Sequence, residues 1–205
     1  MMGNFLRNLL ILGLVFITAL MTGCASEESY QEEVNDYLTG KQILMVIAPG
    51  NFRDEELLIP REVFEQHGAD VNLACSKTGQ FKGMFGAVAN VEILLSDVNP
   101  ADYDAVIFVG GSGAKLYWDE PQAHELARKF DQEVKLIGAI CIAPVILDRA
   151  GILEGKEATV FSSATPQIKT ARLKDANVVV DGRVVTGNGP EAAEKFAKAI
   201  VDLLK

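Results

Sequence analysis

The sequence predicts an α/β fold in which a mostly parallel β-sheet is covered by helices on both faces. Three observations support this prediction. From residue 41 onward, short apolar segments alternate with longer amphipathic ones. The apolar segments are continuous, which is typical of strands that are buried on both sides. The amphipathic segments have a helical period, and glycine follows several of them.

The segments between residues 41 and 130 follow this alternation. An apolar strand comes first, and a segment with apolar residues at positions 57, 58, 59, 63 and 64 follows it as a helical stripe that Gly68 ends. Residues 79–89 contain several glycines and predict a flexible loop or a hairpin. The expected strands are 42–48, 70–76 and 105–109, and the expected helices are 55–67 and 120–130.

The rest of the chain continues the pattern. A strand at 135–140 leads directly into a helix at 144–150, which Gly151 closes. Residues 177–181 and 183–186 flank an Asp-Gly pair, which is the signature of a tight β-hairpin. The last predicted helix, 191–204, has apolar residues at positions 196, 197, 200, 203 and 204.

The N-terminal region has a different composition. Residues 1–8 carry one arginine, residues 9–20 are almost wholly apolar, and Met21-Thr-Gly-Cys24 ends in a small residue followed by cysteine. This pattern resembles a bacterial lipoprotein signal peptide over residues 1–23, with cleavage before Cys24 and acylation of its thiol. An uncleaved membrane anchor is the alternative. Both interpretations place the protein at a membrane of the cell envelope.

Residues 24–40 hold five acidic residues and have no steady apolar period, so they predict a solvated tether to a domain that spans 41–205. The whole chain of 205 residues has a formal net charge of −9. No cluster of Lys and Arg is present to displace counterions from phosphates, which argues against nucleic acid as a partner. An acidic protein stays at an anionic membrane only through a lipid or a buried segment.

The most informative segment is Leu136-Ile-Gly-Ala-Ile-Cys-Ile-Ala-Pro144. An apolar run suited to a buried strand ends at Cys141, and a helix that begins with proline follows at once. Such a sharp turn lifts its central side chain clear of the sheet and directs free backbone N–H groups toward whatever that side chain attacks. We therefore predict a nucleophile elbow, with Cys141 as the nucleophile and Ile142 supplying a backbone N–H.

Two further segments should lie beside the elbow, because the reactive groups of an open parallel sheet gather outside the carboxyl ends of its strands. They are residues 49–56 and Gly110-Gly-Ser-Gly113. Gly110 and Gly111 let the backbone approach a ligand closely and can present an N–H toward the thiol. A Gly-Gly pair after a strand predicts only a turn when it stands alone, but beside an elbow it predicts an oxyanion site.

Four motifs in the right order resemble the ThiJ/PfpI superfamily, which includes the Parkinsonism-associated protein deglycase and the PfpI-type proteases. The resemblance covers residue 41 to the C-terminus. It implies a flavodoxin-like three-layer sandwich of the class I glutamine amidotransferase type, usually dimeric, with Cys141 as the reactive thiol and Glu56 as a carboxyl group hydrogen-bonded to it. The motifs are Phe52-Arg-Asp-Glu-Glu-Leu-Leu-Ile-Pro60, Asp102-Tyr-Asp-Ala-Val-Ile-Phe-Val-Gly-Gly111, Ala139-Ile-Cys-Ile-Ala-Pro144, and 178–190 with its Asp-Gly turn and Gly-Pro pair.

The chemistry of a Cys141–Glu56 pair follows from electrostatics. The amides at a helix N-terminus lower the pKa of a thiol, whereas an ionised carboxylate beside the thiol raises it. We therefore expect a thiolate that accepts a hydrogen bond from protonated Glu56, with the two groups titrating as one coupled system. Without the resemblance, Glu56 would be interpreted as a solvated residue in the first turn of a helix.

The chain departs from the peptidase pattern. PfpI-type proteases are expected to have histidine directly after the cysteine, where this chain has Ile142, and some relatives supply a histidine where it has Phe161. Its two histidines, His67 and His124, lie in predicted helices and are expected at the surface. Peptide hydrolysis needs a base for the nucleophile and a proton for the leaving amine, so a cysteine peptidase is disfavoured.

Three other functions remain open. Addition of sulfur to a reactive aldehyde needs only one proton shuttle, so we favour a glyoxalase- or deglycase-type activity on small carbonyl compounds, with Cys141 as nucleophile and Glu56 as acid and base. The second hypothesis is a non-enzymatic redox sensor or stress-protection protein in which Cys141 is oxidised. The third is a binding domain that retains the pocket without turnover.

Two other residues are candidates for a role near the site. Cys75 ends the second strand and is expected to be a small buried hydrophobe, and a disulfide with Cys141 is disfavoured because the strand order implied by the resemblance separates them. Trp118 is expected to pack in the core, with a pocket wall or a dimer face as alternatives. No cluster has metal-ligand spacing and no Gly-rich phosphate loop appears, so we expect neither a metal nor another cofactor.

Overall fold

The structure, a computed structural model, describes residues 36–205. The predicted signal peptide, the predicted acylation site Cys24 and residues 24–35 of the predicted tether lie outside the described residues. Within residues 36–205, no helix combines the length and the apolar character needed to cross a membrane. The described region contains the whole segment for which the sequence predicts an α/β domain.

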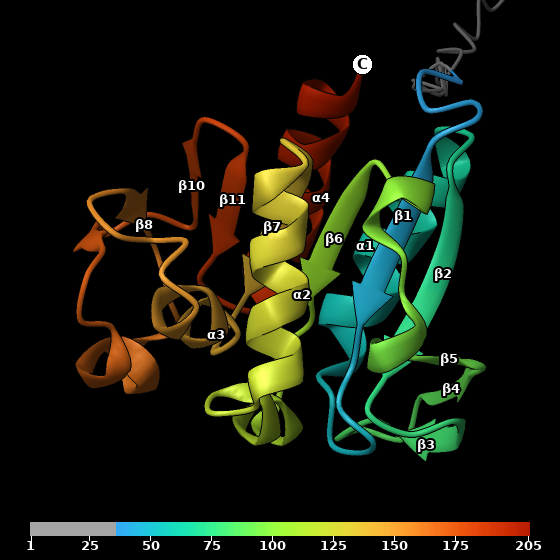
Figure 1. Ribbon diagram of the computed structural model, residues 1–205, viewed down its shortest axis with the longest axis horizontal. Helices are drawn as coiled ribbons and strands as arrows, with labels where there is room; N and C mark the ends of the chain where they lie inside the picture. The colour runs from blue at the N-terminus through green and yellow to red at the C-terminus, as the bar shows by residue number, and fades with distance from the viewer. Residues whose placement is uncertain (1–35) are drawn as a thin grey trace, which may run out of the picture. The chain divides into compact units, whose positions relative to one another are not determined.

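A seven-stranded sheet forms the centre of the fold (Figure 1). Its strands are β1 (Gln42–Val46), β2 (Asp70–Cys75), β5 (Ile93–Leu94), β6 (Ala105–Phe108), β7 (Leu136–Ile140), β10 (Val178–Asp181) and β11 (Val184–Gly187). Their order is β10-β11-β7-β6-β1-β2-β5, and every neighbouring pair is parallel except the β10–β11 hairpin. The mostly parallel sheet and the C-terminal hairpin are therefore confirmed.

Helices cover both faces of this sheet (Figure 1). On one face, α1 (Asp54–Gln66) packs beside α4 (Ala193–Leu204), and on the other α2 (Pro121–Gln132) packs beside α3 (Pro144–Arg149). Each face has its own apolar core, with Phe64 and Phe196 in one cluster and Leu126 and Phe130 in the other. This arrangement is the predicted three-layer sandwich.

The register of the central strands brings their carboxyl ends to one edge of the sheet. Val46 of β1 pairs with Phe108 of β6, and Phe108 in turn pairs with Ala139 of β7. The loops that follow these three strands therefore leave the sheet side by side. This is the edge at which the sequence predicts the reactive groups.

Short elements complete the fold. Residues 79–89, predicted as a loop or a hairpin, contain β3 (Gly79–Lys82) and the start of β4 (Val88–Val91), which pair as an antiparallel hairpin. The sequence does not predict β5, β8 (Glu157–Ala158) or β9 (Arg172–Leu173), because two residues are too few to show a period. Segments of 3₁₀-helix lie at Leu95–Asp97, Pro100–Asp102, Ser112–Tyr117, Ser162–Gln167 and Pro190–Ala192.

The folded domain begins before residue 41. The Leu38 side chain is fully buried, and the Leu38 N–H donates a hydrogen bond to the His67 carbonyl oxygen at 2.8 Å. The Tyr37 ring stacks on the His67 ring with 6.2 Å between centroids, and the Lys205 ammonium lies 4.5 Å from the Tyr37 centroid. Residues 37–40, which the sequence assigns to the tether, therefore pack as part of the domain.

The turn between α2 and β7 holds a residue in an unfavourable conformation. Val134 has a φ of +61°, in the left-handed region that a β-branched residue rarely adopts. Its N–H donates to the Asp131 carbonyl oxygen at 3.0 Å, and the Lys135 N–H donates to that of Phe130 at 3.0 Å. Glycine is the usual residue at such a helix end. Since the Val134 side chain is 66% exposed, little packing compensates for the strain.

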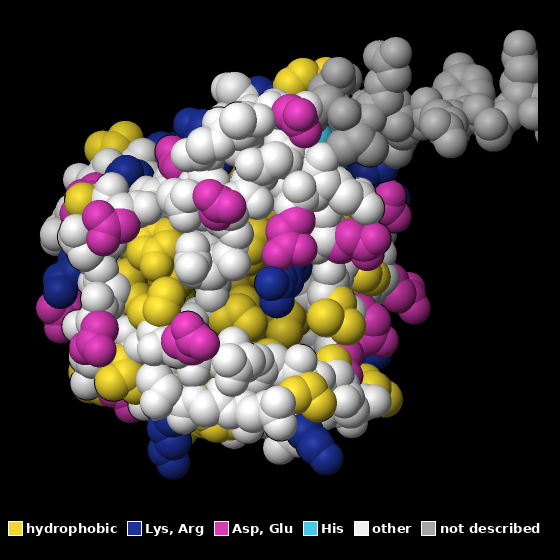
Figure 2. Space-filling view, turned by 90° about the vertical axis from the view of Figure 1, so that its right-hand side faces the viewer, with side chains coloured by type: hydrophobic (Ala, Val, Ile, Leu, Met, Phe, Trp, Pro, Cys, Tyr) yellow, Lys and Arg dark blue, Asp and Glu magenta, His cyan; other side chains and the backbone are white. Residues whose placement is uncertain are grey.

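Acidic side chains are spread over the face of the molecule shown in Figure 2, and basic side chains do not gather into a patch there. This distribution agrees with the formal net charge of −9. The face therefore lacks the basic surface that binding to phosphate backbones requires.

Candidate functional site

Cys141 occupies a strained turn between β7 and α3. Its φ is +65°, in the left-handed region that residues other than glycine rarely adopt. The Cys141 N–H donates to the Gly187 carbonyl oxygen at 2.8 Å, and the Cys141 carbonyl accepts a hydrogen bond from the Phe161 N–H at 2.8 Å. Backbone strain of this kind is typical of functional sites, and the geometry is that of a nucleophile elbow.

Glu56 lies in the first turn of α1, and its side chain is fully buried. Neither carboxyl oxygen has a hydrogen-bond partner of good geometry among the described residues. Gly110 lies between this acid and the elbow, because a Cβ built on Gly110 would be 2.5 Å from Glu56 Oε2 and 2.5 Å from Cys141 Cβ. Only glycine leaves room for both side chains, so the two residues predicted for the site meet across Gly110.

Burial controls the proton affinity of both side chains. It raises the pKa of the Glu56 carboxyl to about 7, although the Cys141 thiol and the positive charge of Arg53 oppose this shift. Burial, and after it the Glu56 carboxylate, raise the pKa of the Cys141 thiol to about 12. The raised pKa of the Glu56 carboxyl agrees with the predicted protonated acid, whereas burial acts on the sulfur against the predicted thiolate.

The three predicted backbone donors divide between the two side chains. The N–H groups of Gly111 and Ile142 lie beside the Cys141 sulfur and lower its pKa. The Gly110 N–H acts in the same way on the pKa of the Glu56 carboxyl. Gly111 and Ile142 are therefore placed to stabilise negative charge that forms near the sulfur, whereas Gly110 serves the acid.

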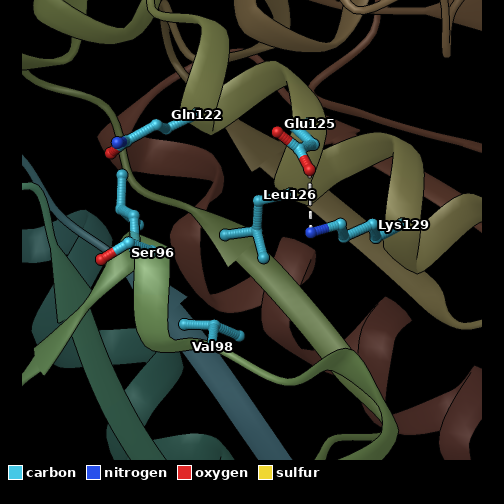
Figure 3. A pocket seen from close by; sticks show the side chains of 7 residues that line it. Ser96, Val98, Gln122, Glu125, Leu126 and Lys129 are labelled. Atoms are coloured by element: carbon cyan, nitrogen blue, oxygen red, sulfur yellow. Dashed lines mark ion pairs between the residues drawn. The ribbon is translucent and has the colours of Figure 1, made fainter.

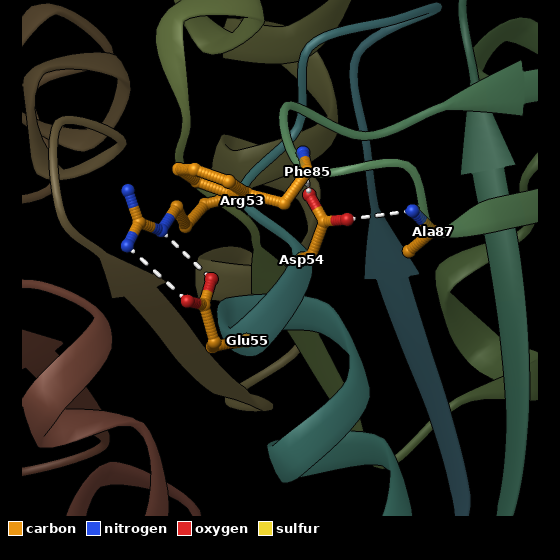
Figure 4. A network of polar contacts seen from close by, with 5 residues as sticks. All are labelled: Arg53, Asp54, Glu55, Phe85 and Ala87. Carbon is orange, nitrogen blue, oxygen red and sulfur yellow. Dashed lines mark hydrogen bonds and ion pairs between the residues drawn. The ribbon is translucent and has the colours of Figure 1, made fainter.

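The first turn of α1 lies within a polar network that the sequence does not predict (Figure 4). Arg53 forms a two-point ion pair with Glu55, with N–O distances of 2.8 and 3.2 Å, and its guanidinium lies 4.4 Å from the Phe85 ring centroid. The buried Asp54 carboxylate accepts hydrogen bonds from the backbone N–H groups of Phe85 at 3.0 Å and Ala87 at 2.6 Å. These contacts hold the β3–β4 loop against the turn that carries the buried acid.

The two histidines bind backbone oxygens instead of the reactive groups. His67 Nδ1 lies 2.7 Å from the Val63 carbonyl oxygen, and His124 Nε2 lies 2.8 Å from the Trp118 carbonyl oxygen. Both are half-buried, which differs from the predicted surface positions. Neither histidine is hydrogen-bonded to Cys141, so neither is in the position of a catalytic base.

Trp118 and Cys75 have the packing roles predicted for them. Trp118 packs against both apolar cores, and its indole N–H donates to the Ile142 carbonyl oxygen at 3.1 Å, which supports the elbow from behind. Cys75 is fully buried, with its sulfur 3.5 Å from the Tyr117 hydroxyl oxygen. Cys75 and Cys141 are both free, because β1 and β6 separate β2 from β7 in the sheet.

Surface cavities lie both beside the elbow and away from it. A cavity of about 170 Å³ between α2 and residues 95–98 shares no residue with the elbow (Figure 3). Its charged side chains, Glu125 and Lys129, form an ion pair with each other at 2.9 Å. A second cavity, of about 250 Å³, adjoins the elbow and is lined by Phe161, Asn177, Asn188, Gly189, Pro190 and Glu191.

Known proteins resemble this chain over most of its length. The DJ-1/PfpI family matches residues 41–203. An uncharacterized protein from Methanocaldococcus jannaschii is 40% identical, over 95% of this chain and 97% of that protein. A deglycase from Pyrococcus abyssi is 31% identical, over 79% of this chain and 99% of that protein. A glutathione-independent glyoxalase from Caenorhabditis elegans is 30% identical, over 80% of this chain and 89% of that protein.

Solved structures agree with the fold. A ThiJ/PfpI domain protein from Brachyspira murdochii superposes with a TM-score of 0.78 at 34% identity, over 80% of this chain and 95% of that one. Drosophila melanogaster DJ-1beta superposes with a TM-score of 0.74 at 29% identity, over 80% and 90% of the two chains. The predicted flavodoxin-like sandwich is confirmed. Because the family match and the shared fold both extend over most of its length, the chain belongs to the DJ-1/PfpI family.

Proposed function

We propose that the protein acts on small reactive carbonyl compounds, as a glyoxalase or deglycase does, with Cys141 as nucleophile and Glu56 as acid and base. The observation that carries the proposal is that the fully buried Glu56 carboxyl group lies across Gly110 from the elbow cysteine. Burial of a carboxyl group away from water lowers folding stability, so a functional role accounts for its presence. The relatives named as a deglycase and as a glyoxalase support the same chemistry.

The first step joins the sulfur to the substrate. With a pKa of about 7, Glu56 suits a general base at neutral pH. Its carboxylate takes the thiol proton while the Cys141 sulfur attacks the aldehyde carbon and an S–C bond forms. The carbonyl electron pair moves to the oxygen, and the N–H groups of Gly111 and Ile142 stabilise this negative charge. Glu56 then returns the proton to that oxygen, which gives a hemithioacetal.

For methylglyoxal, the same acid can complete the reaction. The Glu56 carboxylate removes the C1 proton of the hemithioacetal and returns a proton to C2, so C1 is oxidised while C2 is reduced within one molecule. The product is a lactate thioester of Cys141. Hydrolysis by water releases lactate and restores the thiol, and no external oxidant or reductant is consumed.

The test is the conversion of methylglyoxal to lactate by the purified protein. Cys141→Ser should lower turnover by about a thousandfold or more, because a hydroxyl replaces the nucleophilic sulfur. Glu56→Gln keeps the size of the side chain and should lower turnover by about a hundredfold or more. Cys75→Ala is the matched control and should retain turnover. Wild-type protein that leaves methylglyoxal unchanged would remove the proposal.

The observations favour the redox-sensor hypothesis less. Peroxide reacts with a thiolate, and burial raises the pKa of the Cys141 thiol, which disfavours the thiolate. After graded peroxide, mass spectrometry should therefore show no preferential gain of two oxygens at Cys141. A preferential gain at that residue would favour the sensor over the enzyme.

A peptidase is not proposed. The positions at which the ThiJ/PfpI resemblance leads one to expect histidine hold Ile142 and Phe161, and the pair that remains has one proton-transfer group, Glu56. An amide is less electrophilic than an aldehyde and its nitrogen must be protonated to leave. The site therefore suits carbonyl addition better than peptide hydrolysis.

We also propose that a lipid on Cys24 holds the domain at a membrane of the cell envelope, with the acidic residues that follow as a tether. The support is the sequence: an apolar segment precedes Cys24 and an acidic one follows it. Cells supplied with labelled palmitate should label the wild-type protein and not Cys24→Ala. Equal labelling of both proteins would overturn this proposal.

We propose a homodimer as the solution state, because the ThiJ/PfpI superfamily that the chain resembles is usually dimeric. Sedimentation equilibrium of the purified protein should give twice the mass that mass spectrometry finds for its single chain. A single-chain mass at micromolar concentration would contradict the dimer without affecting the proposed chemistry.

A further inference from the structure

The cavity of about 250 Å³ beside the elbow has no role in the steps described above. Two hydrogen bonds connect it to the reactive residue. The Phe161 N–H donates to the Cys141 carbonyl oxygen at 2.8 Å, and the Cys141 N–H donates to the carbonyl oxygen of Gly187, the residue before Asn188. Since Phe161 and Asn188 both line the cavity, one of its walls is hydrogen-bonded directly to the backbone of the nucleophile.

One wall of this cavity is aromatic. The Phe161 side chain is 39% exposed, so part of the ring is free to contact a ligand. The ring packs closely on Gly189, where a Cβ would lie 3.0 Å from Phe161 Cδ2. This packing fixes the orientation of the ring. An exposed aromatic face attracts cations through its quadrupole.

The polar groups around the cavity are acceptors. Glu191 contributes a carboxylate that forms no ion pair with any described residue. The Asn188 amide donates to Asn177 Oδ1 at 3.3 Å, which leaves Asn188 Oδ1 available to accept. No Lys or Arg is among the described residues that line the cavity. A negative charge, an amide oxygen and an aromatic face together select a ligand that carries a positive charge and several donors.

We propose that this cavity binds a small organic cation, best a guanidinium group, that the carbonyl substrate carries a few bonds from its aldehyde. A planar guanidinium can stack on Phe161 while it donates to Glu191 and Asn188, whereas an ammonium can use only one of these modes at full strength. The assignment of this cation to the substrate rests on the proposed function. The cation site itself can be tested without turnover.

The binding test compares butylguanidinium with butylurea, which has nearly the same shape and no charge. Isothermal titration on the full chain carrying Cys141→Ser should show about tenfold tighter binding of butylguanidinium. Glu191→Gln should remove most of this preference, and Phe161→Leu should reduce it. Glu194→Gln is the matched control, because it removes a charge from a neighbouring exposed position that is paired with Lys198, and it should retain the preference.

Equal affinity for the two compounds would overturn the proposal. Loss of the preference in Glu194→Gln as well as in Glu191→Gln would also overturn it, because the effect would then come from the general negative charge of the chain. Kinetics tests the link to the substrate with α-oxoaldehydes, which the proposed reaction can convert: kcat/KM for 5-guanidino-2-oxopentanal should exceed that for 2-oxopentanal by about tenfold in the wild type. Binding of the cation without this kinetic preference would show that the carbonyl substrate does not carry the cation. Absence of any turnover would remove the proposed function and leave the cation site supported by titration.

Discussion

Cys141 and Glu56 face each other across Gly110, and both are removed from bulk solvent. The sequence identifies the cysteine because an apolar strand precedes it and a helix that begins with proline follows it. It identifies the acid only through the family resemblance, because an acid in a first helical turn is usually solvated. Which group holds the proton depends on burial, and no local pattern encodes that. The predicted residues therefore agree with the geometry, whereas the effect of burial on their pKa values could not be predicted from the sequence.

Glu56→Gln should remove a pH-dependent loss of stability. The pKa of Glu56 is raised from 4.5 to about 7, so between these values the native state holds a proton that the unfolded chain has lost. The free energy of unfolding should therefore fall by roughly 3 kcal/mol as the pH rises through this window, and this contribution should be constant above it. Urea unfolding at pH 4.5 and pH 8 measures the fall. The same fall in the free energy of unfolding should persist in the exposed control Glu62→Gln. If Glu56→Gln and the wild type showed equal falls, titratable groups other than Glu56 would cause the pH dependence.

Arg53→Met should raise the pKa of Glu56 further, because the guanidinium charge lowers it in the wild type. The NMR chemical shift of the Glu56 carboxyl carbon, followed over a pH titration, should then change at a pH up to about one unit higher. Arg53→Lys keeps the charge and should keep the wild-type midpoint. An equal shift in Arg53→Lys would instead point to lost packing on Phe85.

At the scale of elements, two features distinguish the first turn of α1, which carries Glu56. Pro60 has no N–H, so the carbonyl oxygen of Glu56, four residues earlier, lacks its usual helical donor. The β3–β4 loop is bound to the same turn through Asp54. The sequence predicts the helix and the main strands because their apolar patterns are long. It does not predict the docking of the loop, because the partners of Asp54 lie more than 30 residues along the chain.

Val134→Gly should stabilise the protein by about 1 kcal/mol. Glycine removes the left-handed strain at the end of α2, and the greater freedom of glycine in the unfolded chain offsets part of the gain. Thermal unfolding should give a higher Tm. Val180→Gly, at a similarly exposed position in β10, should lower the Tm because the strand loses β-propensity. A lower Tm in Val134→Gly would show that this side chain has a packing role.

At the scale of the whole molecule, one sheet separates two apolar cores and carries its reactive groups at a single edge. The alternation of strands and helices predicts the layers. The order of the strands comes from the family resemblance, since continuous apolar strands do not specify their neighbours. The predicted start of the domain at residue 41 is too late, because one buried leucine, Leu38, stands among acidic and polar residues.

Leu38→Ala should destabilise the domain by about 2–4 kcal/mol, because the side chain is fully buried and its loss leaves a cavity. Urea unfolding of the purified protein measures the change. Leu58→Ala, at a position on α1 that is 48% exposed, should cost about 1 kcal/mol or less. Equal losses of unfolding free energy in the two variants would indicate that residues 37–40 belong to the tether and not to the domain.

The left-handed backbone of Cys141 and the buried carboxyl group of Glu56 both work against folding. Random variants selected only for thermal stability should therefore accumulate substitutions at these two positions, and they should be stable but inactive. A durable catalyst would have to gain its heat resistance elsewhere, and the loop before β7 offers a place to begin.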